Sequence, residues 1–201
     1  MKRSLSLVLL VSLVLVQASC ASKFFTGISS DYPEGWGRVS HSEDPESAIA
    51  GSYKNYGDCS YNPVSTQYSS KPSLGIFLGQ VPFHIADDGA GIVTITRLRP
   101  GTLQVEVVTG GGAKHMRVLE ASKDDFRVAE GAVWLKSQKR SYGDGTGYVW
   151  ENDSLGLRKS DDGALVCEWR HGSAALALWI VPLKGSQIFW MRWWPEKILD
   201  K

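Results

Sequence analysis

Thr102-Leu103-Gln104-Val105-Glu106-Val107 is the stretch that decides the fold of this chain. Polar and apolar residues alternate strictly along it, which places Leu103, Val105 and Val107 on one face of an extended strand. A helix would need an apolar stripe with a period of about 3.6 residues, and no segment of the chain sustains one. The stretch therefore predicts a β-strand that is buried on one face.

Short segments rich in β-branched and aromatic residues lie on both sides of this strand. They cover residues 49–54, 92–98, 113–119, 126–128, 133–137, 148–151, 155–158, 165–170, 176–181 and 188–193. Turn residues separate several of them: Asp88-Gly89, Gly110-Gly111-Gly112, Asp162-Gly163 and Lys184-Gly185-Ser186. Residues 73–78 are too short for periodicity to distinguish a helical turn from a buried strand. We therefore predict an all-β fold with little helix over residues 48–201, a single antiparallel barrel or sandwich of about 8–10 short strands.

The first 21 residues have the composition of a secretory signal peptide. Lys2 and Arg3 give a positive start, residues 5–16 are almost wholly apolar, and small residues follow at 18–21. The apolar run is shorter than the roughly 20 residues that a membrane-spanning helix needs. The pattern predicts an exported protein.

Two cleavage sites fit this signal. Val16-Gln17-Ala18-Ser19-Cys20 resembles the lipobox of bacterial lipoproteins, with Gln17 where that family prefers an apolar residue. The resemblance implies a lipid anchor on Cys20 and, because Ala21 rather than Asp follows, an outer-membrane lipoprotein that faces the periplasm. Ordinary cleavage after Ala21 would instead release a soluble periplasmic or secreted protein.

Residues 22–47 are polar, contain several Pro and Gly residues, and show no period, so we predict a polar tether. Tyr32 and Trp36 are unusual in a linker, and we expect them to pack on the β domain. Without residues 1–21 the chain has 20 basic and 21 acidic residues, a net charge of −1. No basic run appears, so the chain lacks the electrostatic signature of nucleic-acid binding.

Cys59 and Cys167 are the two cysteines that remain in the exported domain. Disulfides persist outside the cytoplasm, so we predict a bond between them. The alternative is a metal site that uses a histidine. The four histidines, His41, His84, His115 and His171, are widely spaced and form no ligand pair, so no metal or other cofactor is predicted.

Candidate catalytic residues have ordinary structural explanations. Ser154 follows Asp153, but Asn152-Asp153-Ser154 has the composition of a turn, and the chain contains no Gly-x-Ser-x-Gly motif. The adjacent pairs Asp87-Asp88, Asp124-Asp125 and Asp161-Asp162 are expected to point into solvent rather than toward each other. Residues 143–147 faintly resemble a calcium loop but lack the EF-hand spacing. We therefore predict no catalytic site.

The aromatic residues near the C-terminus are the most distinctive feature. In Ile188-Phe189-Trp190-Met191-Arg192-Trp193-Trp194 both faces of a strand are apolar or aromatic, so one face is either covered by another element or exposed for binding. The candidate binding surface is formed by Trp190, Arg192, Trp193 and Trp194.

These patterns favour a non-catalytic lipoprotein of the cell envelope with an interaction or structural role, whose partner is an envelope protein or a small apolar ligand. One alternative is a carrier of a small apolar or sugar ligand with a lipocalin-like or aromatic-lined cavity. Lipocalins usually open with Gly-x-Trp on the first strand, and Glu34-Gly35-Trp36 departs from that motif. The other alternative is an enzyme with an unrecognised site.

Overall fold

The all-β prediction is confirmed, and the architecture is a sandwich. The computed structural model describes residues 31–60, 72–78, 91–144, 147–177 and 181–196. Among these residues two antiparallel sheets face each other and do not close into a barrel. Helix is confined to α2 (Pro45–Ala48), α3 (Leu74–Phe77) and the 3₁₀ turn η1 (Ala121–Lys123).

The two sheets differ in size. The four-stranded sheet has the order β1 (Gly51–Lys54), β3 (Ile92–Arg99), β4 (Thr102–Val108) and β5 (Lys114–Glu120). The seven-stranded sheet has the order β2 (Asp58–Cys59), β11 (Val181–Trp193), β10 (Leu165–Ala177), β9 (Gly147–Lys159), β7 (Ala132–Leu135) and β6 (Phe126–Ala129), with β8 (Gln138–Asp144) also paired to β9. The chain crosses between the sheets after β1, after β2 and after β5.

Alternation along the strands builds the core between the sheets. Leu103, Val105 and Val107 of β4 are all buried, as the opening pattern predicts. From the facing sheet, Leu165 and Cys167 are also buried, and the neighbouring Trp169 packs against the same cluster. We call this core-facing side of the seven-stranded sheet its inner face and the opposite side its outer face.

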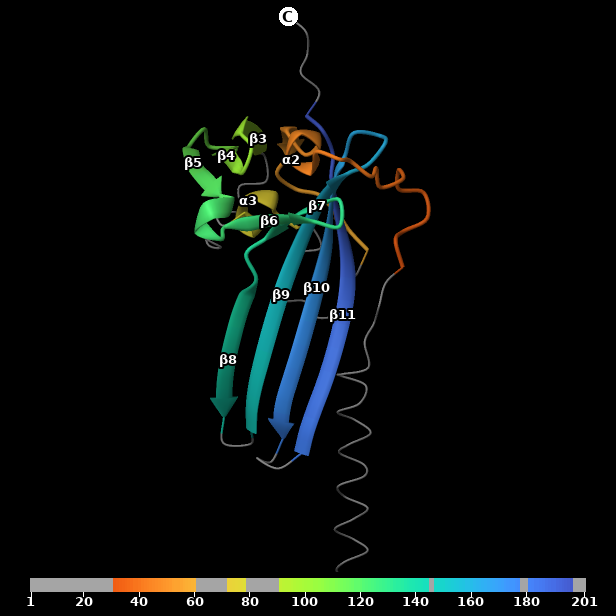
Figure 1. The fold of residues 1–201 in the computed structure, drawn as a ribbon, viewed down its shortest axis with the longest axis vertical. Helices are drawn as coiled ribbons and strands as arrows, with labels where there is room; N and C mark the ends of the chain where they lie inside the picture. The colour runs from red at the N-terminus through yellow and green to blue at the C-terminus, as the bar shows by residue number, and fades with distance from the viewer. Residues whose placement is uncertain (1–30, 61–71, 79–90, 145–146, 178–180, 197–201) are drawn as a thin grey trace, which may run out of the picture.

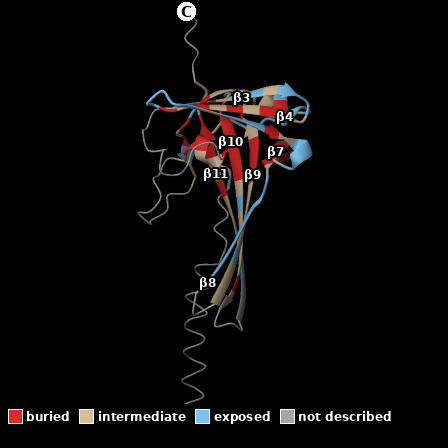
Figure 2. Cartoon of the chain, turned by 90° about the vertical axis from the view of Figure 1, so that its left-hand side faces the viewer, coloured by how far each residue is buried: buried red, intermediate tan, exposed pale blue. Residues whose placement is uncertain are grey.

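Three strands of the seven-stranded sheet are much longer than the sandwich. Strands β9, β10 and β11 each contain 13 residues, and only one half of each lies against the four-stranded sheet. The other halves extend beyond it, and β8 lies beside β9 there (Figure 1). Buried residues gather in the sandwich, whereas this extension is mostly intermediate or exposed (Figure 2). We call the extension the protruding sheet; it comprises residues 138–144, 147–153, 171–177 and 181–187.

Two predicted turns lie inside strands. Asn152-Asp153-Ser154 is in the middle of β9, and Lys184-Gly185-Ser186 is in β11. Pairing explains the difference, because Asn152 is opposite Gly172, which is opposite Ser186. Asn152 and Gly172 are paired on both sides and Ser186 on one, so the backbone hydrogen bonds of the ladder outweigh local turn propensity.

Residues 74–77 form the helical turn α3 rather than a strand, and the Ser73 side chain accepts a hydrogen bond from the Ile76 N–H.

The described part of the predicted tether, residues 31–47, lies against the sandwich. Val39 forms a β-bridge with Ser160, and the Ser40 N–H donates to the Lys159 carbonyl at 2.9 Å. The Asp161 N–H donates in turn to the Arg38 carbonyl at 2.9 Å. This part of the segment is therefore held by backbone hydrogen bonds rather than being a free linker.

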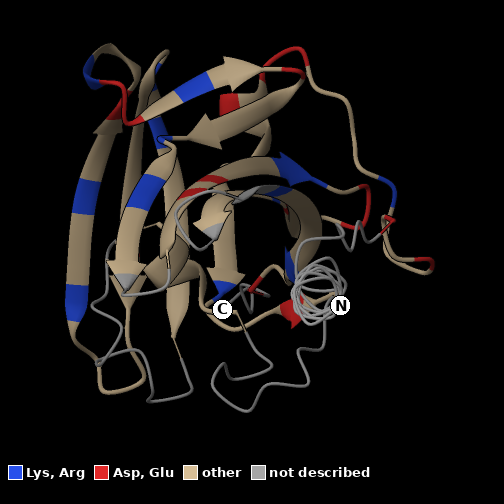
Figure 3. Cartoon of the chain, turned by 90° about the horizontal axis from the view of Figure 1, so that it is seen from below, with Lys and Arg blue, Asp and Glu red and all other residues tan. Residues whose placement is uncertain are grey.

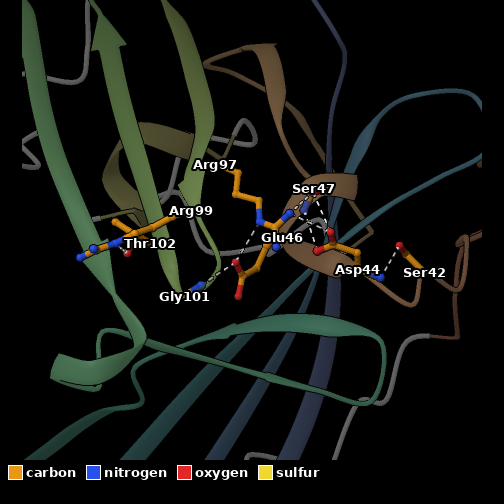
Figure 4. Close-up of polar contacts among 8 residues, drawn as sticks. All are labelled: Ser42, Asp44, Glu46, Ser47, Arg97, Arg99, Gly101 and Thr102. Atoms are coloured by element: carbon orange, nitrogen blue, oxygen red, sulfur yellow. Dashed lines mark hydrogen bonds and ion pairs between the residues drawn. The ribbon is translucent and has the colours of Figure 1, made fainter.

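Helix α2 is joined to the β3–β4 hairpin by an arginine (Figure 4). Arg97 of β3 donates to Asp44 at 2.9 Å and to Glu46 at 3.4 Å. Glu46 also accepts a 2.9 Å hydrogen bond from the Gly101 N–H in the hairpin turn. Asp44 caps α2 through Ser47, so this network connects the N-terminal segment to the four-stranded sheet.

The predicted Cys59–Cys167 disulfide is wrong: the structure contains no bond between these residues. Cys59 is opposite Met191, and Met191 is opposite Cys167. The two cysteines therefore lie on neighbouring sides of β11, about 10 Å apart at two strand spacings. A disulfide requires Cα atoms within about 7 Å, so the intervening strand prevents the bond.

Candidate functional site

The aromatic surface predicted at the C-terminal end of the chain is mostly covered. Trp193 is completely buried in the core, and its indole N–H donates to the Pro72 carbonyl at 2.9 Å. Trp190 lies on the outer face beneath Tyr32, whose ring meets it edge-on at 5.0 Å between centres. Tyr32 in turn meets Trp36 edge-on at 5.9 Å, so the expected packing of this aromatic pair on the β domain is confirmed.

Arg192 is the centre of this aromatic cluster. Its guanidinium carbon lies 4.6 Å from the Trp36 ring centre and 3.9 Å from that of Trp194. Asp58 and Asp162 lie within ion-pair distance, at 3.5 and 3.8 Å, and the side chain is 9 % exposed. Trp190 and Arg192 thus anchor the N-terminal segment, whereas Trp193 belongs to the core. The four predicted residues do not form an open binding surface together, although Trp194 remains partly exposed.

A second charged cluster lies on the same outer face, around the buried Trp134. The guanidinium of Arg170 lies 4.3 Å from the Trp134 ring centre. Glu168 accepts hydrogen bonds from Arg158 and Arg170, each at 2.6 Å. Burial alone would raise the pKa of Glu168, but the two arginines outweigh it and lower that pKa. The charges of this cluster are paired with one another, which suits a structural role.

A groove lies on the outer face of the protruding sheet. It has a volume of about 700 Å³ and spans all four strands. Strand register places the side chains at 139, 141, 150, 152, 172, 174, 184 and 186 on one face, and all eight residues line the groove. No described segment crosses this face (Figure 1).

Trp150 of β9 forms one wall of the groove, and Tyr148 supports it from the side. Trp150 is 47 % exposed, and its ring centre lies 4.5 Å from that of Tyr148. Tyr148 lies over Gly143 of β8, where a Cβ would approach the tyrosine ring to 2.9 Å. The absence of a side chain at 143 thus leaves room for the Tyr148 ring, which is tilted by 59° relative to that of Trp150.

Small residues form the floor of the groove along β10. Gly172 and Ala174 lie opposite Asn152 and Trp150, respectively. A Cβ built at Gly172 would meet among the described residues only the Asn152 carbonyl oxygen, at an ordinary 3.7 Å. The space above Gly172 is therefore open, and the strand does not require glycine there for steric reasons.

The rim of the groove is basic and polar. Lys139 of β8 and Lys184 of β11 stand on opposite sides, both exposed. Neither lysine forms an ion pair with any described residue, and none of the eight side chains that register directs into the groove is Asp or Glu. Glu151 also borders the groove, but register directs its side chain to the inner face, where it accepts a hydrogen bond from the Tyr142 hydroxyl. Asn152 is held by a hydrogen bond from the Ser137 hydroxyl. Elsewhere acidic and basic residues are interspersed (Figure 3), so the basic character is local to this groove.

The inner face of the protruding sheet carries a histidine–aspartate pair. His171 Nδ1 lies 2.7 Å from Asp153 Oδ1, and the Trp169 indole N–H donates to the same oxygen at 2.9 Å. Burial alone would raise the pKa of Asp153, but the hydrogen bonds from His171 and Trp169 outweigh it and lower that pKa. The hydrogen bond with Asp153 raises the pKa of His171.

Among the described residues, no nucleophile lies beside this pair. Ser154, the serine beside Asp153 in the sequence, lies on the outer face opposite Arg170, so it points away from His171. No described serine, threonine or cysteine has a hydrogen bond to His171. The pair therefore connects β9 and β10 across the sheet.

Asp124 and Asp125 point to different cations, whereas the side chains of Asp161 and Asp162 both lie beside Gly37, within 2.8 Å of the position that a Cβ would take there. Asp124 pairs with Lys136 at 3.6 Å and Asp125 with Arg117 at 3.3 Å. Asp162 accepts hydrogen bonds from Ser160 and from the Ala164 N–H in the β9–β10 turn. Residues 87–88 and 145–146 lie outside the described residues, as does His84. Within the described part of the chain, no three His, Cys, Asp or Glu residues come together as a metal site.

A small pocket lies between the two sheets at the edge of the sandwich. It has a volume of about 170 Å³ and lies between Phe77, Leu119 and Leu155. Ligand sites for small molecules usually occupy about 300–1,000 Å³, so this pocket is smaller than the cavity of a lipocalin-like carrier would be.

The groove residues were missed because none of them belongs to a known motif. Tyr148-x-Trp150 in a strand is the one signal that could have indicated an aromatic face, since alternate residues share a side of the sheet.

The predicted lipidation site Cys20 and the rest of 1–21 lie outside the described residues. Across the described chain, none of the helices is long and apolar enough to span a membrane. Comparisons with protein-family models, with curated proteins and with solved structures find no match.

Proposed function

We propose that this protein is a non-catalytic lipoprotein of the cell envelope that uses the protruding sheet to bind another envelope component. The observation that carries this proposal is the groove on the outer face of that sheet. It combines an exposed tryptophan, unpaired lysines and a floor of small residues in a region that contributes little to the core. A sheet extended beyond its sandwich costs backbone order without burying apolar area, so a binding role accounts for it better than stability does.

The N-terminal signal supports the placement in the envelope. The lipobox-like segment ending at Cys20 favours a lipid anchor, and Ala21 favours the outer membrane with the domain facing the periplasm. Cleavage after Ala21 is the alternative and would give a soluble exported protein with the same binding sheet.

Replacement of Cys20 by Ser tests the anchor. We expect the wild-type protein in the outer-membrane fraction and labelled by radioactive palmitate. The C20S protein should be unlabelled and absent from that fraction. Equal membrane association of both proteins would contradict the lipid anchor, and wild-type protein retained in the cytoplasm would contradict the envelope role.

Photo-crosslinking in intact cells tests the binding role of the protruding sheet. A photoreactive amino acid is placed at Ser141 or Ser186, which line the groove, and at Met116, a 63 % exposed control on β5. We expect irradiation to give an adduct from the two groove positions and none from Met116. Equal adduct patterns at all three positions, or none at the groove, would contradict the proposal.

A further inference from the structure

We propose that the groove on the protruding sheet binds an acidic glycan, a chain of sugar rings that carry carboxylate or phosphate groups. The inference rests on the proposed function and specifies the ligand of the same site. It follows from three properties of the groove: its aromatic wall, its dimensions and its charge.

The aromatic wall suits the apolar face of a sugar ring. Trp150 is half exposed, and Tyr148 holds it from one side. An indole ring offers a flat apolar surface on which the C–H face of a sugar can pack. Asn152, Ser141 and Ser186 surround this surface with amide and hydroxyl groups that hydrogen-bond to sugar hydroxyls.

The dimensions of the groove match an extended chain of rings. The wall on β9 and the rim on β11 are two strand spacings apart, about 10 Å. Along β9, residues 148–152 extend over about 14 Å. Gly172 and Ala174 leave the floor low between these sides, so a flat chain can lie along β10. Two to three sugar rings would fill roughly that length.

The charge of the groove selects an anionic ligand. Lys139 and Lys184 stand on opposite rims without an ion-pair partner among the described residues. None of the eight side chains that register directs into the groove is acidic, and Glu151, which also borders it, is directed by register to the inner face, where it accepts a hydrogen bond from Tyr142. The arginines around Trp134, farther along the outer face, are already paired with Glu168. A carboxylate or phosphate on the ligand would complete charge-assisted hydrogen bonds with these lysines.

The edges of the protruding sheet disfavour an extended peptide as the occupant. A peptide would add to an edge strand through backbone hydrogen bonds. The β8 edge carries Lys139 and Arg140, and the β11 edge carries Pro182, which lacks an N–H, followed by Lys184. Charged residues and proline are the features that protect edges from pairing, so binding at the face is favoured.

Titration of the purified mature protein with polygalacturonate, a polymer of sugar carboxylates, tests the proposal, with neutral dextran as the matched control. Calorimetry should show binding of polygalacturonate that weakens by at least about ten-fold between roughly 0.05 M and 0.5 M salt, and no comparable binding of dextran. The K139Q/K184Q double variant should lose about ten-fold in affinity and most of the salt dependence. Lys114→Gln, an exposed lysine on β5, should behave as wild type.

Two further variants distinguish specific binding in the groove from non-specific binding elsewhere on the surface. Trp150→Ala should weaken binding by about ten-fold, whereas Tyr142→Ala, an exposed aromatic on the inner face of the same hairpin, should not. Gly172→Val should fill the floor and weaken binding to a similar extent while the thermal midpoint is unchanged or higher. A thermal midpoint measured for each variant shows that it is folded.

Wild-type affinity of Gly172→Val and Trp150→Ala would overturn the assignment of the groove. Absence of polygalacturonate binding would overturn the glycan class, and salt-sensitive binding to anionic phospholipid vesicles without binding to the polymer would assign the surface to a membrane instead. In both cases groove-specific crosslinks in cells would leave the proposed function standing. Absence of those crosslinks would contradict the proposed function independently of the glycan result.

Discussion

At the scale of single residues, Gly156 and Gly172 show how position decides what a glycine does. Both lie on the outer face of the seven-stranded sheet, one in β9 and the other in β10. The Trp134 ring lies directly on Gly156, where a Cβ would approach three ring atoms to 2.8–2.9 Å. Gly172 has open space above it. The first glycine is required by packing, and the second leaves room in the groove.

Gly156→Ala should therefore destabilise the protein by about 1–3 kcal/mol, because the added methyl group overpacks a buried tryptophan. Gly172→Ala should instead be neutral or stabilising by about 0.5 kcal/mol, because alanine loses less backbone entropy in a strand. Urea denaturation of the two variants beside wild type measures both effects. Equal destabilisation by the two substitutions would contradict the packing of Trp134 on Gly156.

His171 and Asp153 should make stability depend on pH. The folded pKa of His171 is raised by Asp153, so the stabilisation by the charged histidine is fully present below its unfolded pKa and is lost as pH rises through the folded pKa. Asp153 has a lowered pKa and stays ionised throughout that range.

Wild type should therefore be more stable than His171→Gln by the order of 1 kcal/mol at about pH 5.5, and by less at about pH 9. Chemical denaturation at both pH values measures the difference. An advantage that is constant or grows toward pH 9 would contradict the raised pKa.

At the scale of elements, the N-terminal segment behaves as part of the domain from residue 31 onward. The aromatic strand 188–193 has apolar residues on both faces because this segment covers its outer side. The sequence left open whether this outer side is covered by another element or exposed for binding. The cation–π contact of Arg192 with Trp36 shows that the N-terminal segment covers it.

Trp36→Ala should destabilise the domain by about 1 kcal/mol, since it removes one ring from a nearly buried guanidinium. It should also speed proteolysis within residues 31–39. Trp150→Ala is the matched control, because that tryptophan is half exposed and should change stability by less than about 0.5 kcal/mol. Limited proteolysis and denaturation test both variants, and identical behaviour would argue against the packing of Trp36 on Arg192.

At the scale of the whole molecule, the order of the strands prevents the disulfide that the number of cysteines predicted. Two cysteines in an exported domain predicted a disulfide, yet β11 lies between β2 and β10 and carries Met191 between the two thiols. Burial raises the pKa of the Cys167 thiol, which further lowers its reactivity.

Mass spectrometry of peptides prepared without reductant should therefore find no peptide that joins Cys59 to Cys167. Carbamidomethylation after unfolding gives the reference masses. Recovery of the linked pair from freshly exported protein would mean that the order β2–β11–β10 is incorrect.

The sequence by itself determined the strands whose evidence is local. Residues 92–98, 102–107 and 113–119 were found with nearly their true bounds, and Leu103, Val105, Val107 and Cys167 were assigned to the correct face. Apolar residues at positions i and i+2 indicate which face of a single strand is buried, so the prediction does not require the partner strand to be known.

Only the tertiary structure decided which weak strand formers continue a strand, which aromatic residues are covered and where a groove opens. Asn152, Gly172 and Ser186 resemble loop residues until register aligns them across three strands. Trp190 and Arg192 resemble a binding surface until a segment some 150 positions earlier in the chain lies on them. These outcomes depend on pairing between distant residues, whose free energy is absent from any local window of the sequence.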